Sequence, residues 1–83
     1  MVERRHLSRR RRIEEAEITF DHTSLKVMLL DLSDTGARVT LYTPSDVPEV
    51  VSLRLPDGSI RVACRRWQRN DEVGFEFLTP IAA

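Results

Sequence analysis

The sequence predicts an all-β domain, a small six-stranded antiparallel β-barrel preceded by a flexible basic N-terminal arm. Beyond residue 13, apolar residues recur mostly at every second position in short runs, a pattern typical of strands rather than helices. Turn segments rich in Asp, Ser, Asn, Pro and Gly separate these runs. We expect closure into a barrel, because closure removes the unpaired edges of so small a sheet.

Six runs have the length and pattern of strands. Alternation is clearest in residues 51–55 and 60–64, and the segment Pro56-Asp57-Gly58 between them predicts a hairpin. The predicted strands are Glu14–Phe20, Leu25–Asp31, Ala37–Tyr42, Val50–Leu55, Ile60–Gln68 and Glu72–Leu78.

The alternation also predicts which side chains fill the core. Phe75 and Phe77 share one face of the last strand and are expected to be buried. Cys64 lies in an alternating apolar run, which favours a buried thiol over a reactive one. Trp67 has the opposite parity from Val62 and Cys64, so it either lies on the outer face or follows a β-bulge; we favour a core position after a bulge.

The chain has 83 residues, enough for one domain, which we divide into an Arg-rich arm (residues 1–12) and a barrel domain (residues 13–83). A single cysteine leaves no internal disulfide and fits a reducing compartment. Residues 4–12 are mostly charged where a signal peptide would be apolar, and no run approaches the ~20 apolar residues of a membrane span. We therefore expect a soluble cytoplasmic protein without membrane insertion.

Charge is distributed unevenly although the chain is neutral overall. Residues 1–12 carry six of the 13 basic residues and one of the 13 acidic residues, so this arm is strongly cationic and the remainder is acidic. Such asymmetry indicates an arm that meets phosphate, although a solvated tail or an arm lying on its own acidic body would show the same pattern.

Two motifs and the last strand resemble the PilZ domain, the bacterial receptor module for cyclic di-GMP. The arm contains Arg-His-Leu-Ser-Arg at residues 5–9, which matches R-x-x-x-R, and residues 31–36, Asp-Leu-Ser-Asp-Thr-Gly, match [D/N]-x-S-x-x-G. Residues 73–78, Val-Gly-Phe-Glu-Phe-Leu, also resemble the family. The resemblance covers essentially the whole chain and implies a PilZ-like split barrel that binds this ligand without a cofactor. The implied ligand-binding residues are Arg4, Arg5, Arg9, Asp31, Ser33 and Gly36.

The arm has suitable chemistry for such a ligand. An arginine fork meets the adjacent O6 and N7 acceptors of guanine two bonds at a time, and phosphate oxygens accept the same fork. Arg5 and Arg9 are separated by up to ~13 to 14 Å in an extended chain, which lets them hold different parts of one ligand. In relatives, an arginine at the place of Arg4 is associated with a stacked pair of ligands, so one or two nucleotides can bind.

The turn can complement the arm. Asp31 can accept hydrogen bonds from the N1–H and N2 edge of guanine, and the Ser33 hydroxyl can contact the ligand or brace the loop. Gly36 would permit a backbone conformation that a side chain would block. The alternative is a plain structural turn in which Asp31 and Ser33 cap backbone amides.

The sequence thus predicts a non-enzymatic cyclic di-GMP receptor that orders its arm over the barrel and signals to an unidentified downstream protein. Catalysis and metal binding are not expected, because His6 and His22 have no partner at ligand spacing and Ser33 lacks a nucleophile-elbow motif. Two alternatives stay open: a PilZ-like protein-interaction module without ligand binding, and a nucleic-acid-binding module. The acidic body and the lack of aromatic residues in the arm argue against nucleic acid.

Overall fold

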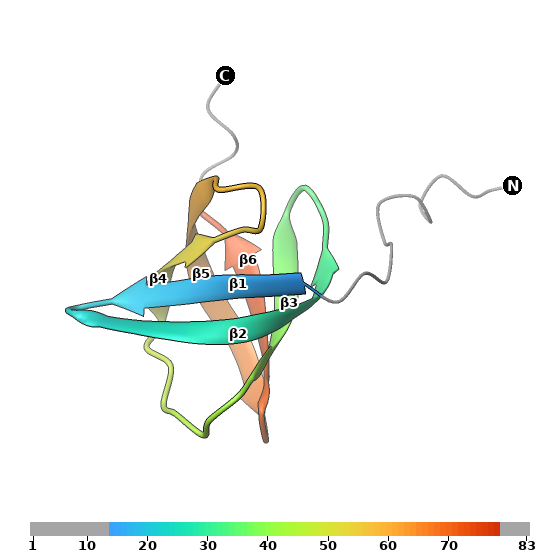
Figure 1. Cartoon of the computed structure of the whole chain (residues 1–83). Helices are drawn as coiled ribbons and strands as arrows, with labels where there is room; N and C mark the ends of the chain where they lie inside the picture. The colour runs from blue at the N-terminus through green and yellow to red at the C-terminus, as the bar shows by residue number, and fades with distance from the viewer. Residues whose placement is uncertain (1–13, 79–83) are drawn as a thin grey trace, which may run out of the picture.

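The computed structural model describes residues 14–78, which form six antiparallel strands (Figure 1). The strands are β1 (Glu14–Phe20), β2 (Thr23–Leu32), β3 (Gly36–Leu41), β4 (Val50–Arg54), β5 (Ile60–Arg69) and β6 (Glu72–Phe77). All six predicted strands are confirmed, with ends that differ by at most two residues. The predicted arm, residues 1–12, lies outside the described residues.

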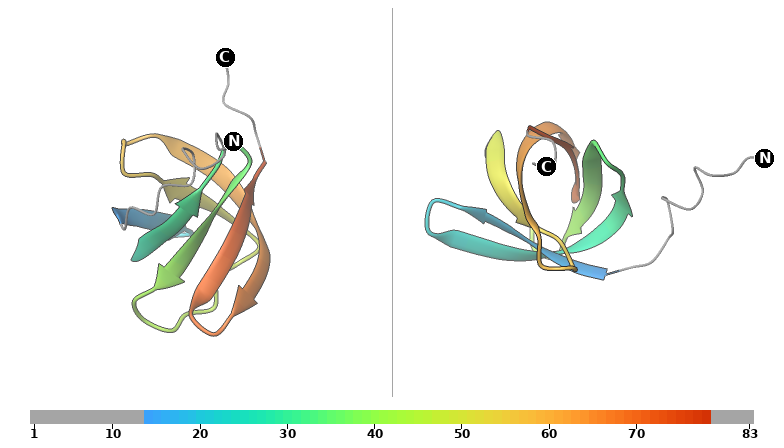
Figure 2. Two further views of the ribbon diagram at one scale, coloured as in Figure 1. Left: turned by 90° about the vertical axis from the view of Figure 1, so that its right-hand side faces the viewer. Right: turned by 90° about the horizontal axis from the view of Figure 1, so that it is seen from above.

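The strands close into a barrel in the order β1-β2-β3-β6-β5-β4 (Figure 2). Closure is made by β1 and β4, where Ile18 pairs with Leu53. Because every strand has a neighbour on both sides, the sheet has no continuous open edge, as predicted. The hairpin between β1 and β2 extends beyond the barrel on one side (Figures 1 and 2).

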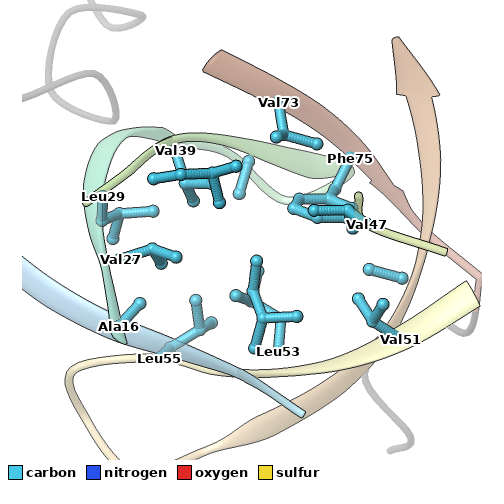
Figure 3. Packing of buried hydrophobic residues seen from close by; sticks show 14 of the residues in the cluster. Ala16, Val27, Leu29, Val39, Val47, Val51, Leu53, Leu55, Val73 and Phe75 are labelled. Carbon is cyan, nitrogen blue, oxygen red and sulfur yellow. The ribbon is translucent and has the colours of Figure 1, made fainter. Parts of the chain in front are cut away.

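Alternate side chains of every strand fill the barrel (Figure 3). Apart from Gly74, every buried residue among the described residues has an apolar side chain. The core therefore depends on hydrophobic burial and close packing. Phe75 and Phe77 are 5% and 8% exposed, which confirms their predicted core positions. The largest fully buried side chains are Ile18, Leu53, Val27, Val39 and Val73.

The tight turns use residues that tolerate unusual backbone conformations. Asp21 and Asn70 adopt positive φ angles of 53° and 56° in the β1–β2 and β5–β6 connections. Gly58 has φ 93° in the predicted β4–β5 hairpin, and Asp57 Oδ1 accepts hydrogen bonds from the Ser59 amide and hydroxyl at 2.8 and 2.7 Å. Asn, Asp and Gly visit this region more readily than other residues, so these turns set where the strands reverse.

The prediction for β5 was wrong about which face is buried. Val62 is 40% exposed and Cys64 is half-buried, whereas Ala63 is fully buried. Ala63 pairs with Val51 in β4 and Phe77 in β6, both of which point into the core. Because cross-strand partners point to the same side of a sheet, the register places the small alanine inward and the larger apolar side chains outward.

The part of the chain from residue 14 to residue 78 contains no helix that could cross a membrane.

Burial depth predicts how two leucine-to-alanine changes will differ. Leu53→Ala leaves a cavity at a fully buried position and should lower the free energy of unfolding by about 2–5 kcal/mol. Leu78→Ala removes the same atoms at a position that is 50% exposed and should change it by less than about 1 kcal/mol. Chemical denaturation of both variants measures the difference, and equal losses would contradict the described core.

Candidate functional site

Four residues from four neighbouring strands lie side by side on the outer face of the barrel. Asp31 of β2 pairs with Arg38 of β3, Arg38 pairs with Gly74 of β6, and Gly74 pairs with Trp67 of β5. We call Asp31, Arg38, Gly74 and Trp67 the cross-strand row. Directly paired residues are about 4.5–5.5 Å apart, so the row brings residues that are distant in sequence into one site.

Two β-bulges put the ends of this row on the outer face. Leu29 is buried, so strict alternation would turn Asp31 inward too; a register shift between these two residues turns it outward. A second shift, between Arg65 and Trp67, does the same at the other end of the row. The predicted bulge before Trp67 is confirmed, but the predicted core position is wrong, because the indole is 42% exposed. Bulges commonly re-aim side chains in this way beside functional sites.

The Arg38 guanidinium is held between two carboxylates. Its Nε and Nη2 donate to Asp31 Oδ2 at 2.9 and 2.5 Å, and its Nη1 donates to Glu72 Oε1 at 3.2 Å. The hydrogen bond with Asp31 is the main cause that raises the pKa of Arg38, so this side chain stays protonated. Within residues 14–78, both hydrogen bonds to the Asp31 carboxylate are accepted by Oδ2, and Oδ1 accepts none.

The absence of a side chain at Gly74 leaves the space that the Trp67 indole occupies. A Cβ at Gly74 would lie 2.3 Å from the indole Nε1 and 2.4 Å from Cε2, so any larger residue would displace the ring. The indole therefore packs against the backbone of Gly74. Such cross-strand packing of an aromatic ring on a glycine stabilises a sheet at a residue that has no side chain of its own. The result is a half-exposed aromatic surface over Gly74, whose pairing partner on the other side is Arg38.

The predicted turn residues have different tasks. The Ser33 amide donates to the Gly36 carbonyl at 2.9 Å, and the Ser33 Oγ accepts from the Thr35 amide at 3.3 Å, so Ser33 braces the turn. Gly36 does not have a positive φ angle, which corrects the expectation of an unusual backbone conformation. A Cβ at Gly36 would lie 2.3 Å from the Phe75 carbonyl oxygen, so glycine is needed there because β3 and β6 approach closely.

These residues line one open pocket on the barrel surface. The lining residues are Asp31, Leu32, Ser33, Gly36, Ala37, Arg38, Arg66, Trp67, Gly74 and Phe75. The structure thus brings together three of the six predicted site residues, Asp31, Ser33 and Gly36. The other three, in the arm, lie outside the described residues.

The described chain begins beside this pocket. Glu14, the first residue of β1, pairs with Leu29 of β2, two residues before Asp31. Arg9 and Arg5 precede Glu14 by five and nine residues, which an extended chain spans in about 17 and 31 Å. These contour lengths are upper limits on the separation of Arg9 and Arg5 from the start of β1.

Acidic side chains outnumber basic ones in and around the pocket. Arg66 pairs with Glu76 at 3.3 Å, and Arg38 pairs with two acids, so both guanidinium groups that line the pocket already have carboxylate partners. Three carboxylates thus face two guanidinium groups. An anionic ligand would need further cations, and residues 1–12 contain six arginines.

Sequence reasoning missed Arg38, Glu72 and the outward position of Trp67. Asp31 and Arg38 lie on opposite sides of the same turn and pair in the β2–β3 hairpin. Their positions relative to the turn could have indicated this pairing. The roles of Glu72 and Trp67 depend on the pairing of β3 with β6 and β6 with β5, which no local pattern reveals.

Comparison with known proteins identifies the family model that fits this chain. The PilZ domain model matches residues 3–83, nearly the entire sequence. No curated protein matches the chain. Within residues 14–78, no group of three or more His, Cys, Asp or Glu side chains could hold a metal ion.

The contact between Gly74 and the indole predicts a spectroscopic effect. Gly74→Ala should push Trp67 into solvent and shift its emission to longer wavelength, with a loss of about 1–3 kcal/mol in the free energy of unfolding from overpacking. Since Trp67 is the only tryptophan in the chain, emission reports on this site alone. In a Trp67→Ala background the same glycine change should cost clearly less; equal costs in both backgrounds would show that the indole is not the obstacle.

Proposed function

The chain belongs to the PilZ domain family, and we propose that it is a non-enzymatic receptor for cyclic di-GMP. PilZ domains are in general cyclic di-GMP receptors, ligand-binding modules rather than enzymes. The observation that carries the proposal for this chain is the placement of Asp31, Ser33 and Gly36 in one pocket with the exposed face of Trp67. We assign the pocket to the ligand, residues 1–12 to a ligand-binding arm and residues 13–83 to the barrel domain.

The described pocket suits a guanine base. Asp31 Oδ1 can accept from the N1–H and N2–H edge of guanine while Oδ2 stays bound to Arg38. The Trp67 indole offers a flat apolar surface on which a base can stack, an interaction worth roughly 1–3 kcal/mol per base. Ser33 acts indirectly in this proposal, by holding the turn that follows Asp31.

The phosphates are assigned to the arm. Because the pocket arginines are already paired with acids, Arg5 and Arg9 are the groups proposed to bind the phosphates and the Hoogsteen edge of a guanine. Arg4 is proposed to contact the same ligand or a second, stacked nucleotide. The chain enters β1 opposite Leu29, two residues before Asp31, and we propose that the arm closes over the pocket from this side.

Binding can produce a signal through the arm. In the proposed complex the arginines are ordered over the pocket, which creates a surface made jointly by the arm and the barrel for a downstream protein. Ordering each backbone residue costs about 1–2 kcal/mol, so the contacts made by the arm must exceed this cost for binding to occur.

A nucleic-acid-binding role is the second candidate, and the exposed Trp67 is the feature that favours it, because aromatic platforms stack on single-stranded bases. The carboxylates of Asp31, Glu72 and Glu76 around this platform oppose a polyanion that would follow the surface. A small ligand with two phosphates held by the arm avoids most of this repulsion.

Isothermal titration calorimetry with cyclic di-GMP tests the proposal. The wild-type protein should bind with measurable heat, and Arg5→Ala or Arg9→Ala should weaken binding at least about 10-fold, which corresponds to about 1.4 kcal/mol. The loss is expected because each variant removes a charge-assisted, two-bond contact.

Arg54→Ala is the matched control, since Arg54 pairs with Glu17 at 3.8 Å and lines none of the proposed site. This variant should bind within about twofold of wild type. A single-stranded oligonucleotide titrated in parallel should give no comparable binding. Tight oligonucleotide binding with no response to cyclic di-GMP would favour the second candidate, and silence toward both ligands would favour a protein-interaction module.

A further inference from the structure

We propose that Glu72 determines base specificity in this receptor, acting through Arg38 on Asp31. This inference rests on the proposed function and adds a residue of β6 that belongs to neither motif. Glu72 is a positioning residue in this scheme, because it contacts Arg38 and does not line the pocket. The chemical group recognised is the guanine edge that donates two hydrogens, N1–H and N2–H.

The geometry supports a relay across three strands. Glu72 of β6 accepts from Nη1 of Arg38 in β3, while Nε and Nη2 of the same guanidinium donate to Oδ2 of Asp31 in β2. A guanidinium is planar and rigid, so fixing one edge of it with Glu72 orients the edge that holds Asp31. The carboxylate of Asp31 is then held with Oδ1 unengaged by residues 14–78.

The fork of Arg38 has few other constraints. The side chains of Arg38, Asp31 and Glu72 are 41%, 38% and 44% exposed, so packing alone does not hold them in place. Without Glu72, the guanidinium keeps a single carboxylate partner and can rotate with it. An aspartate held from one side only would present its free oxygen in several directions, which weakens a hydrogen bond that needs a defined angle.

Glu72→Gln distinguishes this relay from a simple charge effect, because the two predict opposite changes in the affinity for cyclic di-GMP. If charge alone matters, removing a negative charge near the site should strengthen the binding of a dianion, however the side chains are arranged. The relay predicts weaker binding, because a neutral amide holds the guanidinium less firmly than a carboxylate does. The direction of change in affinity therefore decides between them.

The experiment titrates cyclic di-GMP into the wild-type protein, Glu72→Gln, Arg38→Lys and Glu17→Gln, with affinity measured by calorimetry. Glu72→Gln should weaken binding about 3- to 10-fold. Arg38→Lys keeps the positive charge but loses the planar fork, so it should weaken binding in the same range. Glu17→Gln removes a carboxylate that is paired with Arg54 on another part of the barrel, and it should stay within about twofold of wild type.

Cyclic di-AMP provides the specificity readout, because adenine has no N1–H to donate to Asp31. Its affinity should be unchanged or higher in Glu72→Gln, so the preference for the guanine nucleotide should fall. Thermal unfolding of each variant verifies that it is folded at the titration temperature, which is expected for partly exposed positions.

Equal or tighter binding of cyclic di-GMP by Glu72→Gln would overturn the relay, and so would an equal loss for both nucleotides. These results are distinct from failure of the proposed function. If wild type does not bind cyclic di-GMP, the receptor assignment itself is wrong; if wild type binds and Glu72→Gln binds as well, only the role of Glu72 is wrong.

Discussion

Strict alternation of side chains is the constraint on which the rest of this barrel depends. In a closed sheet each strand can give only every second residue to the core, and the others face outward. The two β-bulges interrupt this rule once in β2 and once in β5. Each interruption reverses the alternation, so that Asp31 and Trp67 face outward while Leu29 and Ala63, which precede the two bulges, stay buried. The site therefore exists because alternation is broken at two positions and kept elsewhere.

The positions of the strands could be predicted from the sequence, because the turns have local chemical causes. Asp21, Asn70 and Gly58 tolerate positive φ angles, and such residues mark reversals without knowledge of the partner strand. The buried face of β5 could not be predicted in this way. Ile60 and Val62 form an apolar outer stripe, and the inward positions between the strand ends include Arg61, so hydrophobicity points to the wrong face.

Arg61 shows how a charged residue can occupy an inward position. Its guanidinium carbon lies 4.6 Å from the centre of the Phe77 ring, so the cation rests on an aromatic face. The long aliphatic stem of arginine can follow an apolar surface. A sequence pattern that classes arginine as polar predicts that Arg61 lies on the outer face. Register, which depends on β4 and β6 as well as on β5, decides the face instead.

The candidate site was predictable to the extent that it is local in sequence. Asp31, Ser33 and Gly36 lie within six residues, so their motif was visible, and the turn they form is present. The reason for Gly36 was not visible, because the atom that excludes a side chain belongs to Phe75 in β6. The same holds for Arg38 and its second carboxylate, which is 34 residues away in sequence. Contacts between distant strands must be known before such residues can be assigned a role.

The pairing of charges in the pocket implies a division of tasks between barrel and arm. Arg38 and Arg66 are each neutralised by carboxylates, so the barrel surface presents an acceptor and an aromatic face, both suited to a base, and offers little to a phosphate. Under the proposed function, a dianionic nucleotide is then bound well only when arginines from the arm are present in the same site. Ligand affinity and arm position become thermodynamically linked, because whatever stabilises one arrangement must favour the other. Under the same proposal, the signal is carried by the arm, and the closed barrel keeps its fold.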